Sequence, residues 1–384
     1  MWKRLLHRLR CIECGGNLEL RVIKERHVPL SHESVSHGEG LGLKKSELSH
    51  YIETGILFCP KCRIWHPIIH GLPVILPFQT THIRKFFRQY SGEIKKLGEE
   101  YAHPEHKPMP CERSVLKTFS TEWIDYPSDD VLWTWSHEQR ERIFLGEIGD
   151  LSSLEKSESF LELGCGLGVV TSFAAKRLQG DAIGVDLSLA AGRAVEKFKD
   201  NPFLHFIQAS LWKIPLGKES FDAVYSHGVL HHTYCAQKAF GEMARFCKPE
   251  GLCYLWIYGE KSIYDNPGRN AAYAAETLLR PLLSRLPESL ATIILYPVAF
   301  AYVVISRMQK IMGRKDMVYN FSRGLHAARD RFTPLFAHRT SLEDAHHWFE
   351  QEGFKDIREV SLADLPPEAH ETFRRNIGLR AFKI

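Results

Sequence analysis

The sequence lacks the features that would place it in several large classes of protein. Its 50 Lys and Arg residues against 46 Asp and Glu give a formal net charge of only +4, without the basic excess of a protein that holds nucleic acid mainly by neutralising phosphates. No repeat of solenoid period is present. With 44% hydrophobic and 25% charged residues, the composition is not that of a disordered chain. Its 384 residues predict a globular protein of two or three domains, at about 150 residues each.

Long apolar runs are also scarce. The opening residues, MWKRLLHRLR, lack the apolar core of a secretory signal, and the nine cysteines are an odd number, so we predict a reducing, cytoplasmic location. The longest apolar stretch, residues 290–305, contains Pro297 and is shorter than the roughly 20 residues that cross a bilayer. Basic residues flank it: Arg280, Arg285, Arg307, Lys310, Arg314 and Lys315. We predict a cap over a pocket, with peripheral contact to an anionic membrane as the alternative.

Four of the cysteines form two Cys-x-x-Cys pairs, Cys11 with Cys14 and Cys59 with Cys62. Two such pairs supply the four soft ligands of a closed tetrahedral zinc site. The alternative is a redox-active pair of cysteines. A redox pair would be a single Cys-x-x-Cys motif at the start of a helix, and neither pair here is followed by a predicted helix. Because four thiolates leave no open coordination position, we predict a structural Zn²⁺ ion. The polar segment between the pairs, residues 27–50, is predicted to be a loop.

The surroundings of these cysteines carry a resemblance to a known family. CIECGGNL begins at Cys11, GILFCPKC begins at Gly55, and the pattern Pro-Ile-x-x-Gly-x-Pro begins at Pro67. In this order the segments resemble the zinc-ribbon activator subunits of tRNA and translation-factor methyltransferases, over residues 11–76. The resemblance implies a zinc ribbon that supports a methyltransferase, here within one chain.

After residue 159 the pattern changes to short apolar runs that alternate with helical segments, as in βαβ units of a parallel sheet. The predicted strands are residues 160–163, 182–185, 203–207, 223–226 and 252–258. A helix beginning after Ser341 and two strands at 354–360 and 379–384 follow. We predict five segments: a zinc ribbon at 1–77, a linker with helices at 78–150, a ligand-binding core at 151–259, a helical cap insertion at 260–335, and the last helix and strands at 336–384.

A glycine-rich segment, ELGCGLG, begins at Glu162 and joins the first predicted strand to a helix. Glycines there let a ligand approach the backbone closely. A dinucleotide fingerprint would need glycine at position 169, which is valine, so NAD is not favoured. Asp186 ends the second predicted strand, where a carboxylate can accept hydrogen bonds from ribose hydroxyls.

This pattern, with FDAVYSHGVLHH at residues 221–232 and KPEG at 248–251, resembles the small-molecule branch of the class I S-adenosylmethionine (SAM)-dependent methyltransferases. The resemblance covers about residues 159–258 and implies an α/β fold with a Rossmann-like, seven-stranded sheet that binds SAM. The implied SAM-binding residues are Glu162, Gly164, Cys165, Gly166, Gly168, Asp186, Leu187, Ser210, Leu211 and Ser226. Ser210 stands where the family often has an Asp beside the adenine.

Three histidines, His227, His231 and His232, follow the fourth predicted strand at the edge where open α/β sheets bind ligands. Imidazole is suited to proton removal near neutral pH, so these are the candidate catalytic bases, although each can equally be a packing histidine. Methyl transfer mainly requires alignment, and a base helps only when the acceptor is OH or NH.

The residues after the fourth strand also bear on the acceptor. They lack the Asn/Asp-Pro-Pro-aromatic tetrad that grips a planar amide or exocyclic amine. We therefore predict a small-molecule, glycan or lipid-linked acceptor rather than nucleic acid. The alternatives are an RNA or translation-protein methyltransferase and a non-catalytic SAM-binding scaffold.

Overall fold

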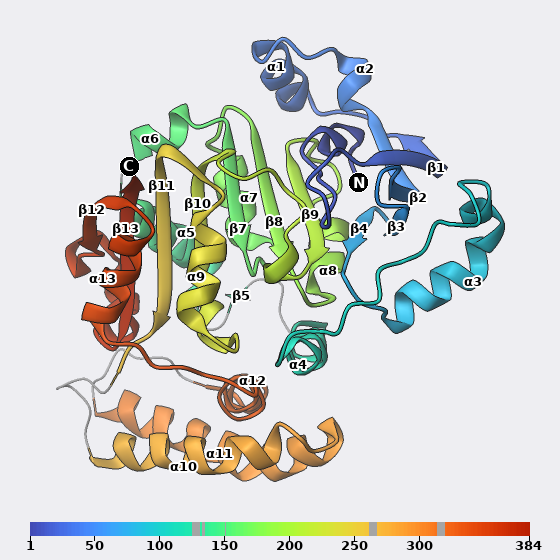
Figure 1. The fold of residues 1–384 in the computed structure, drawn as a ribbon. Helices are drawn as coiled ribbons and strands as arrows, with labels where there is room; N and C mark the ends of the chain where they lie inside the picture. Colours follow the sequence, from blue (N-terminus) through green and yellow to red (C-terminus); the bar gives the residue numbers. More distant parts are fainter. Residues whose placement is uncertain (125–130, 133–134, 150, 261–266, 313–318) are drawn as a thin grey trace.

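The computed structural model describes the chain except residues 125–130, 133–134, 150, 261–266 and 313–318. Its strands are β1 (Glu19–His27), β2 (His50–Cys59), β3 (Ile64–Ile69), β4 (Leu72–Ile75), β5 (Val131–Leu132), β6 (Trp135–Ser136), β7 (Ser159–Leu163), β8 (Asp181–Asp186), β9 (Leu204–Ala209), β10 (Phe221–His227), β11 (Cys247–Tyr258), β12 (Phe354–Glu359) and β13 (Asn376–Lys383). All but β5 and β6 form one eleven-stranded sheet, ordered β1-β2-β3-β4-β9-β8-β7-β10-β11-β13-β12 (Figure 1).

The predicted seven-stranded α/β sheet is confirmed as the part from β9 to β12. In it, β9, β8, β7, β10 and β11 pair in parallel, and β13 runs antiparallel between β11 and β12. The whole sheet has eleven strands rather than seven because β4 pairs in parallel with β9, Val74 opposite Gln208 and Ile75 opposite Ala209. The N-terminal strands β1 to β4 and the core therefore share one continuous sheet.

The helices are α1 (His32–Gly40), α2 (Lys45–Leu48), α3 (Thr81–Lys95), α4 (Glu112–Ile124), α5 (His137–Ile148), α6 (Leu151–Lys156), α7 (Val169–Ala175), α8 (Ala190–Lys197), α9 (Ala236–Ala244), α10 (Pro267–Leu283), α11 (Glu288–Ile311), α12 (Phe321–Phe332), α13 (Leu342–Gln351) and α14 (His370–Phe373). Short 3₁₀ helices are η1 (Lys3–His7), η2 (Leu211–Lys213), η3 (Leu230–His232), η4 (Leu362–Asp364) and η5 (Pro367–Ala369).

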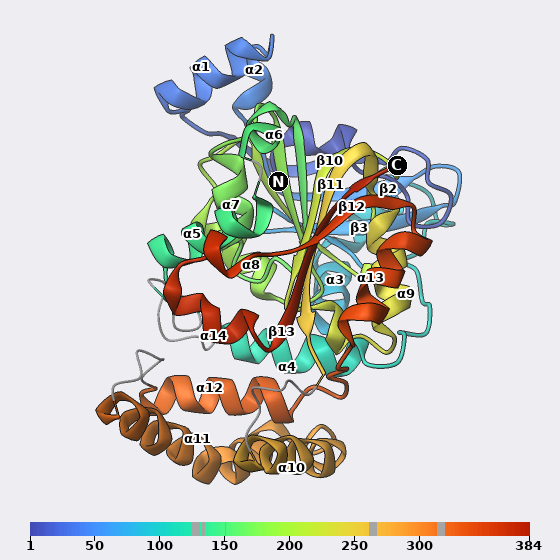
Figure 2. The ribbon, with the colours of Figure 1, turned by 90° about the vertical axis from the view of Figure 1, so that its left-hand side faces the viewer.

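Helices cover both faces of the central strands, which explains why β7 and β9 are buried along their whole length (Figure 2). Successive side chains of β10 alternate between two cores: Tyr225 packs with α5, α7 and α8, and Val224 packs with α9 and α13. The largest buried side chains of the first core include Phe144 and Phe160, and those of the second include Phe240 and Phe349. These two cores hold the carboxyl ends of the parallel strands in place at one edge of the sheet.

Two expectations from the sequence were wrong. The segment predicted as a loop between the cysteine pairs contains α1 and α2, and Ser31 caps α1 by accepting from Ser34 N at 3.1 Å. Most residues of these two helices are exposed, so the helices lack the apolar stripe by which a helix is predicted from sequence.

The apolar stretch predicted at 290–305 is part of a longer helix, α11, which continues through Pro297. Its segment Ser289–Ile311 has 23 residues and a mean hydropathy of 2.0, enough to cross a membrane by length and composition alone. The prediction stopped at residue 305 because polar residues follow it, but Arg, Met, Gln and Lys are good helix formers.

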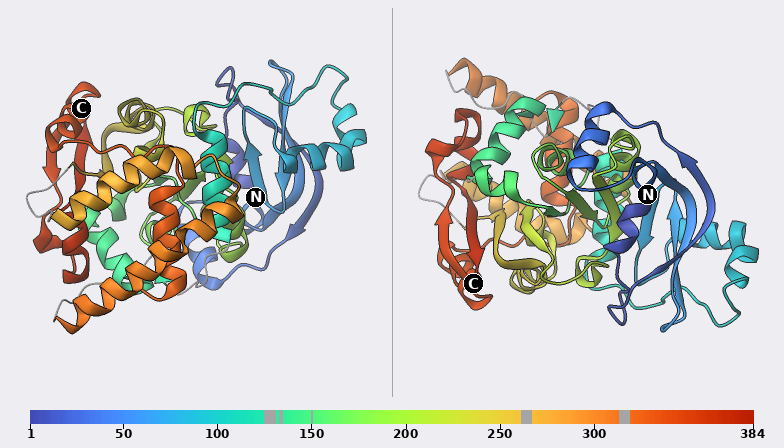
Figure 3. Two further views of the ribbon diagram at one scale, coloured as in Figure 1. Left: turned by 90° about the horizontal axis from the view of Figure 1, so that it is seen from below. Right: turned by 90° about the horizontal axis from the view of Figure 1, so that it is seen from above.

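The insertion of α10, α11 and α12 lies beyond the carboxyl ends of the parallel strands. Figures 1 and 2 show α12 between the strand ends and the outer pair α10 and α11, and Figure 3 shows that pair as the outermost layer when the molecule is seen from below. A small core of Leu283, Leu295, Ala328 and Phe332 joins the three helices. The predicted helical insertion therefore covers the edge at which a ligand would bind.

Candidate active site

A cavity of about 440 Å³ lies between the strand ends and the helical insertion. Its walls come from the glycine-rich loop after β7, the ends of β8, β10 and β11, the start of α4, and the insertion. Of the predicted site residues, the following line it: Glu162, Gly164, Cys165, Gly166, Asp186, Leu187, Leu211, His227 and His232. The topology thus brings together segments that are far apart in the chain, at the edge where open parallel sheets bind ligands.

The glycine-rich loop is shaped by positive φ angles that other residues rarely adopt. Gly164, Gly166 and Gly168 have φ values of 77°, 50° and 74°. Gly164 and Gly166 line the cavity, whereas Gly168 lies beside Phe206 and Ala194, where a Cβ would clash. The first two glycines therefore expose backbone to a ligand, and the third allows helix α7 to pack closely.

Two carboxylates hold this loop. Asp186 accepts from Gly166 N at 2.8 Å and from Ser188 N at 2.7 Å, and burial raises its pKa. Glu162 accepts from the Thr171 hydroxyl, and burial raises its pKa to about 8. Both side chains are preorganised at the cavity wall because backbone and hydroxyl donors fix their orientation.

Ser210 and Ser226 do not line the cavity. The Ser210 hydroxyl accepts from Trp212 N at 3.1 Å, and the buried Ser226 hydroxyl donates to Leu163 O at 3.1 Å. Next to Ser210, Glu112 of α4 enters the cavity wall, and its Oε1 has no hydrogen-bond partner among the described residues. Burial raises the pKa of Glu112, while the nearby Ser210 hydroxyl and a hydrogen bond from Met109 N to Oε2 at 2.7 Å oppose the rise. A carboxylate is therefore present beside Ser210, the position at which the family resemblance implied an aspartate.

Of the three predicted histidines, His227 is the one that lies within hydrogen-bonding distance of a buried carboxylate. Its Nδ1 lies 2.7 Å from Oε1 of Glu147, a fully buried carboxylate at the end of α5. The imidazole stacks on Trp256 with ring centroids 4.4 Å apart and an interplanar angle of 4°. Burial lowers the pKa of His227, and the Glu147 charge opposes this. A neutral ring that donates from Nδ1 to Glu147 has Nε2 as its proton acceptor.

Glu147 is itself held by several donors. Arg140 donates at 3.0 Å, Tyr225 at 2.6 Å and Tyr254 at 3.0 Å, in addition to His227. Although burial alone would raise the pKa of Glu147, the Arg140 and His227 charges and these hydrogen bonds lower it to about 2. Glu147 therefore stays ionised and fixes the orientation of His227.

The other two histidines differ. His231 is buried outside the cavity lining and stacks on Tyr258 with centroids 3.8 Å apart, and neither ring nitrogen has a hydrogen-bond partner within the described ranges. His232 lines the cavity, with Nδ1 at 2.9 Å from Phe336 O and Nε2 at 3.8 Å from Asp330. Burial lowers the pKa of both rings. His227 is thus the histidine with a cavity position and a carboxylate partner in hydrogen-bonding contact.

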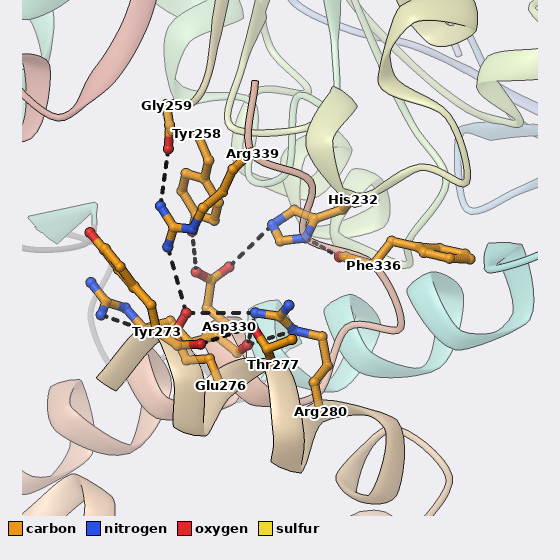
Figure 4. Close-up of polar contacts among 11 residues, drawn as sticks. His232, Tyr258, Gly259, Tyr273, Glu276, Thr277, Arg280, Asp330, Phe336 and Arg339 are labelled. Carbon is orange, nitrogen blue, oxygen red and sulfur yellow. Dashed lines mark hydrogen bonds and ion pairs between the residues drawn. The ribbon is translucent and has the colours of Figure 1, made fainter. Parts of the chain in front are cut away.

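Charged residues tie the helical insertion to the core (Figure 4). Asp330 of α12 accepts from the Tyr258 hydroxyl at 3.0 Å. Arg339 donates to Gly259 O at 3.1 Å, lies 3.8 Å from the Tyr273 ring centroid and is 3.6 Å from Glu276 of α10. These contacts fix α10 and α12 over the end of β11 and form a polar floor for the cavity.

The four predicted metal ligands meet in the N-terminal part of the sheet, outside the cavity lining. The sulfur atoms of Cys11, Cys14, Cys59 and Cys62 all lie within 4.8 Å of one another, and Cys14 Sγ is 3.7 Å from Cys59 Sγ. Gly15, with φ of 70°, shapes the first turn, in which Glu13 N donates to Cys11 Sγ at 3.4 Å. Four convergent thiols are the donor set of a structural zinc ribbon.

Comparison with known proteins identifies the core. The family described as "Methyltransferase domain" matches residues 161–255. This segment is a methyltransferase domain. The match confirms the resemblance to SAM-dependent methyltransferases over the domain, which contains the glycine-rich loop, Asp186 and the three histidines.

The methyltransferase domain is similar to parts of several named proteins. Sterol 24-C-methyltransferase ERG6B of Gibberella zeae is 30% identical over 110 residues, 28% of this chain and 29% of that protein. Malonyl-[acyl-carrier protein] O-methyltransferase of Methylovorus sp. is 31% identical over 136 residues, 33% of this chain and 45% of that protein. The matches span less than half the length of these curated relatives.

Among solved structures, the complex between the Haloferax volcanii Trm112 methyltransferase activator and a putative methyltransferase aligns with a TM-score of 0.39 and 14% identity, over 69% of this chain and 96% of that chain.

Proposed function

We propose that this protein transfers a methyl group from SAM to a small-molecule or lipid-linked acceptor held in the cavity under the helical insertion. The observation that carries the proposal is the meeting of two halves of a site in one cavity. One wall holds the glycine-rich loop and Asp186, and the other holds His227, which Glu147 orients. The first half suits binding of a methyl donor, and the second suits removal of a proton from the acceptor.

The chain offers fitting contacts for SAM. Gly164, Gly166 and Asp186 all line the cavity. The glycine backbone would face the amino-acid end of the donor, and Asp186 would accept from the ribose hydroxyls. Glu112 Oε1 is a buried acceptor suited to the amino group of adenine, a role that Ser210 does not fill from outside the cavity lining. We infer that Glu112 replaces the aspartate that related sequences often carry there.

The bound donor supplies an electrophilic methyl carbon: the acceptor heteroatom bonds to it, the carbon–sulfur bond breaks, and its electrons remain on sulfur as a neutral thioether. Nε2 of His227 takes the proton that an OH or NH acceptor loses. Glu147 stabilises the imidazolium that forms, as a buried carboxylate at 2.7 Å. The insertion, held to the core through Asp330 and Arg339, would keep water away from the reacting groups.

Two observations favour a lipid-linked or acyl-linked acceptor. The named relatives are a sterol methyltransferase and a malonyl-[acyl-carrier protein] methyltransferase, so their names point to lipid or acyl-linked acceptors. Apolar and aromatic side chains in the cavity wall, such as Val115, Phe119 and Trp256, suit an acceptor of that kind.

We also propose that Cys11, Cys14, Cys59 and Cys62 hold one Zn²⁺ ion. The ion would fix the ribbon whose strand β4 pairs with β9 of the core, so its role is structural. Metal analysis of the purified chain tests this, with one zinc per chain expected.

The test of the catalytic proposal combines binding and turnover. Titration calorimetry measures SAM binding to the purified chain, and incubation with methyl-labelled SAM and fractionated lysate shows which fraction takes up label. A His227→Asn variant that binds SAM but transfers no label supports the proposal. SAM binding without transfer by the native chain to any fraction would instead indicate a non-catalytic scaffold.

A further inference from the structure

We propose that the outer side of α10 and α11 docks on the surface of an anionic membrane. This surface, called here the lipid face, is defined by the exposed apolar residues Leu278, Leu282, Ile293, Phe300, Met308 and Ile311. Their exposed fractions run from 57% to 86%, values unusual for so many large apolar side chains in one layer. On α11, Ile293, Phe300 and Ile311 follow helical spacing and form one stripe.

The opposite side of α11 is buried and packs against α12. Ala291, Leu295, Ala299 and Val303 recur every four residues and are buried. At Gly324 of α12 a Cβ would lie only 2.7 Å from Ala299 O, so the two helices approach closely. Arg329 of α12 also donates to the Thr292 hydroxyl at 2.9 Å.

These contacts determine the orientation of α11 in a bilayer. The helix is long and apolar enough to span, but spanning would require it to leave α12 and abandon the Arg329 contact. A helix that stays on α12 instead offers only its outer stripe to the membrane. The structure therefore favours a helix lying in the interface plane, with the stripe among the acyl chains.

Charge identifies the kind of surface that fits. Glu288 is the first residue of α11, but no Asp or Glu occurs from residue 289 to residue 311. Among the described residues, the exposed basic side chains next to the stripe are Arg307, Lys310 and, before α11, Arg285. An apolar stripe bordered by these basic side chains is complementary to acyl chains beneath anionic headgroups. Of the other flanking basic residues named from the sequence, Arg280 pairs with Glu276 at 3.7 Å and donates to Arg331 O at 2.9 Å, and Arg314 and Lys315 lie outside the described residues.

The lipid face and the cavity share the same helices. Gln309 lines the cavity while its neighbours Met308 and Lys310 are exposed, and on α10 the cavity residues Tyr273 and Glu276 precede exposed Leu278. An acceptor whose tail remains in the membrane would thus have its head beside the cavity. The inference deepens the proposed function, on which this last step rests, by naming a lipid-anchored acceptor.

Vesicle flotation with the full chain tests the docking without requiring methyl transfer. We expect flotation with vesicles containing about one third anionic lipid, much weaker flotation with neutral phosphatidylcholine vesicles, and release by high salt. Leu278→Glu with Ile311→Glu should lower vesicle binding at least about tenfold, because both side chains would leave the acyl region. The matched control, Leu342→Glu with Ile384→Glu, changes two exposed apolar residues elsewhere by the same charge and should float like the native chain.

A second pair, Arg307→Ala with Lys310→Ala, should lower binding to anionic vesicles roughly tenfold while leaving neutral vesicles unaffected. Three results would overturn the proposal: no flotation, extraction by detergent only, or a stable dimer that Leu278→Glu with Ile311→Glu dissociates. Calorimetry with SAM on the same variants separates this proposal from the catalytic one. A variant that no longer floats but still binds SAM tests the lipid face and not the proposed function. If the native chain does not bind SAM, the proposed function is refuted but the docking proposal is not.

Discussion

Replacing Glu147 by Gln removes a carboxylate that accepts from four groups in the interior. Its pKa of about 2, against an ordinary 4.5, corresponds to about 3 kcal/mol of free energy that favours the ionised, folded state. Because the folded pKa is the lower one, this stability is present above about pH 4.5 and is lost as the pH falls through that value towards 2. We therefore expect Glu147→Gln to lower the free energy of unfolding by about 3 kcal/mol at pH 7, since Arg140 would remain buried without its counter-charge.

Urea denaturation at pH 7 and at progressively lower pH measures this effect. The difference between native chain and variant should shrink as the pH falls, because the native carboxylate becomes protonated. Glu141→Gln is the matched control: Glu141 pairs with Arg177 at 2.7 Å but is 26% exposed, so its loss should cost less than about 1 kcal/mol. If Glu147→Gln and the control are equally stable at pH 7, the network does not hold the site as described.

The ribbon and the cavity give five further expected outcomes. Cys59→Ser should lose the zinc ion and unfold the ribbon at lower denaturant concentration, measured by metal analysis and circular dichroism. Asp186→Ala should weaken SAM binding by about 1.5 to 3 kcal/mol, and Glu112→Gln by about 1 kcal/mol, both by calorimetry. His227→Asn should lower methyl transfer about 10² to 10⁴-fold with SAM affinity unchanged. Because burial lowers the pKa of His227, the acidic limb of kcat/KM should lie below pH 6.5; a limb above that value would exclude His227 as the base.

Much of the core follows from local sequence pattern. The predicted strands agree with β7 to β11 within a few residues, because a strand buried on both faces is mostly apolar. The ligand loop was equally visible, since Gly164 and Gly166 sit at positive φ, where other residues are strained. The convergence of the four cysteines follows from the spacing of two Cys-x-x-Cys pairs.

The remainder depends on tertiary contacts that leave no local signal. Glu147 is an ordinary helical glutamate in the sequence, and only the packing of α5 against the sheet places it beside His227. Glu112 reaches the cavity from α4, in a segment predicted only as linker and helices. The union of ribbon and core in one sheet was missed because the pairing of β4 with β9 joins residues far apart in the chain.

The most direct test of the central claim is transfer of label from methyl-labelled SAM by the purified, zinc-loaded chain to a fractionated lysate, with His227→Asn as the control. The account predicts that label appears in the lipid or small-molecule fraction with the native chain, and falls at least about a hundredfold with the variant. Label in RNA or protein instead, or equal labelling by both chains, would contradict it.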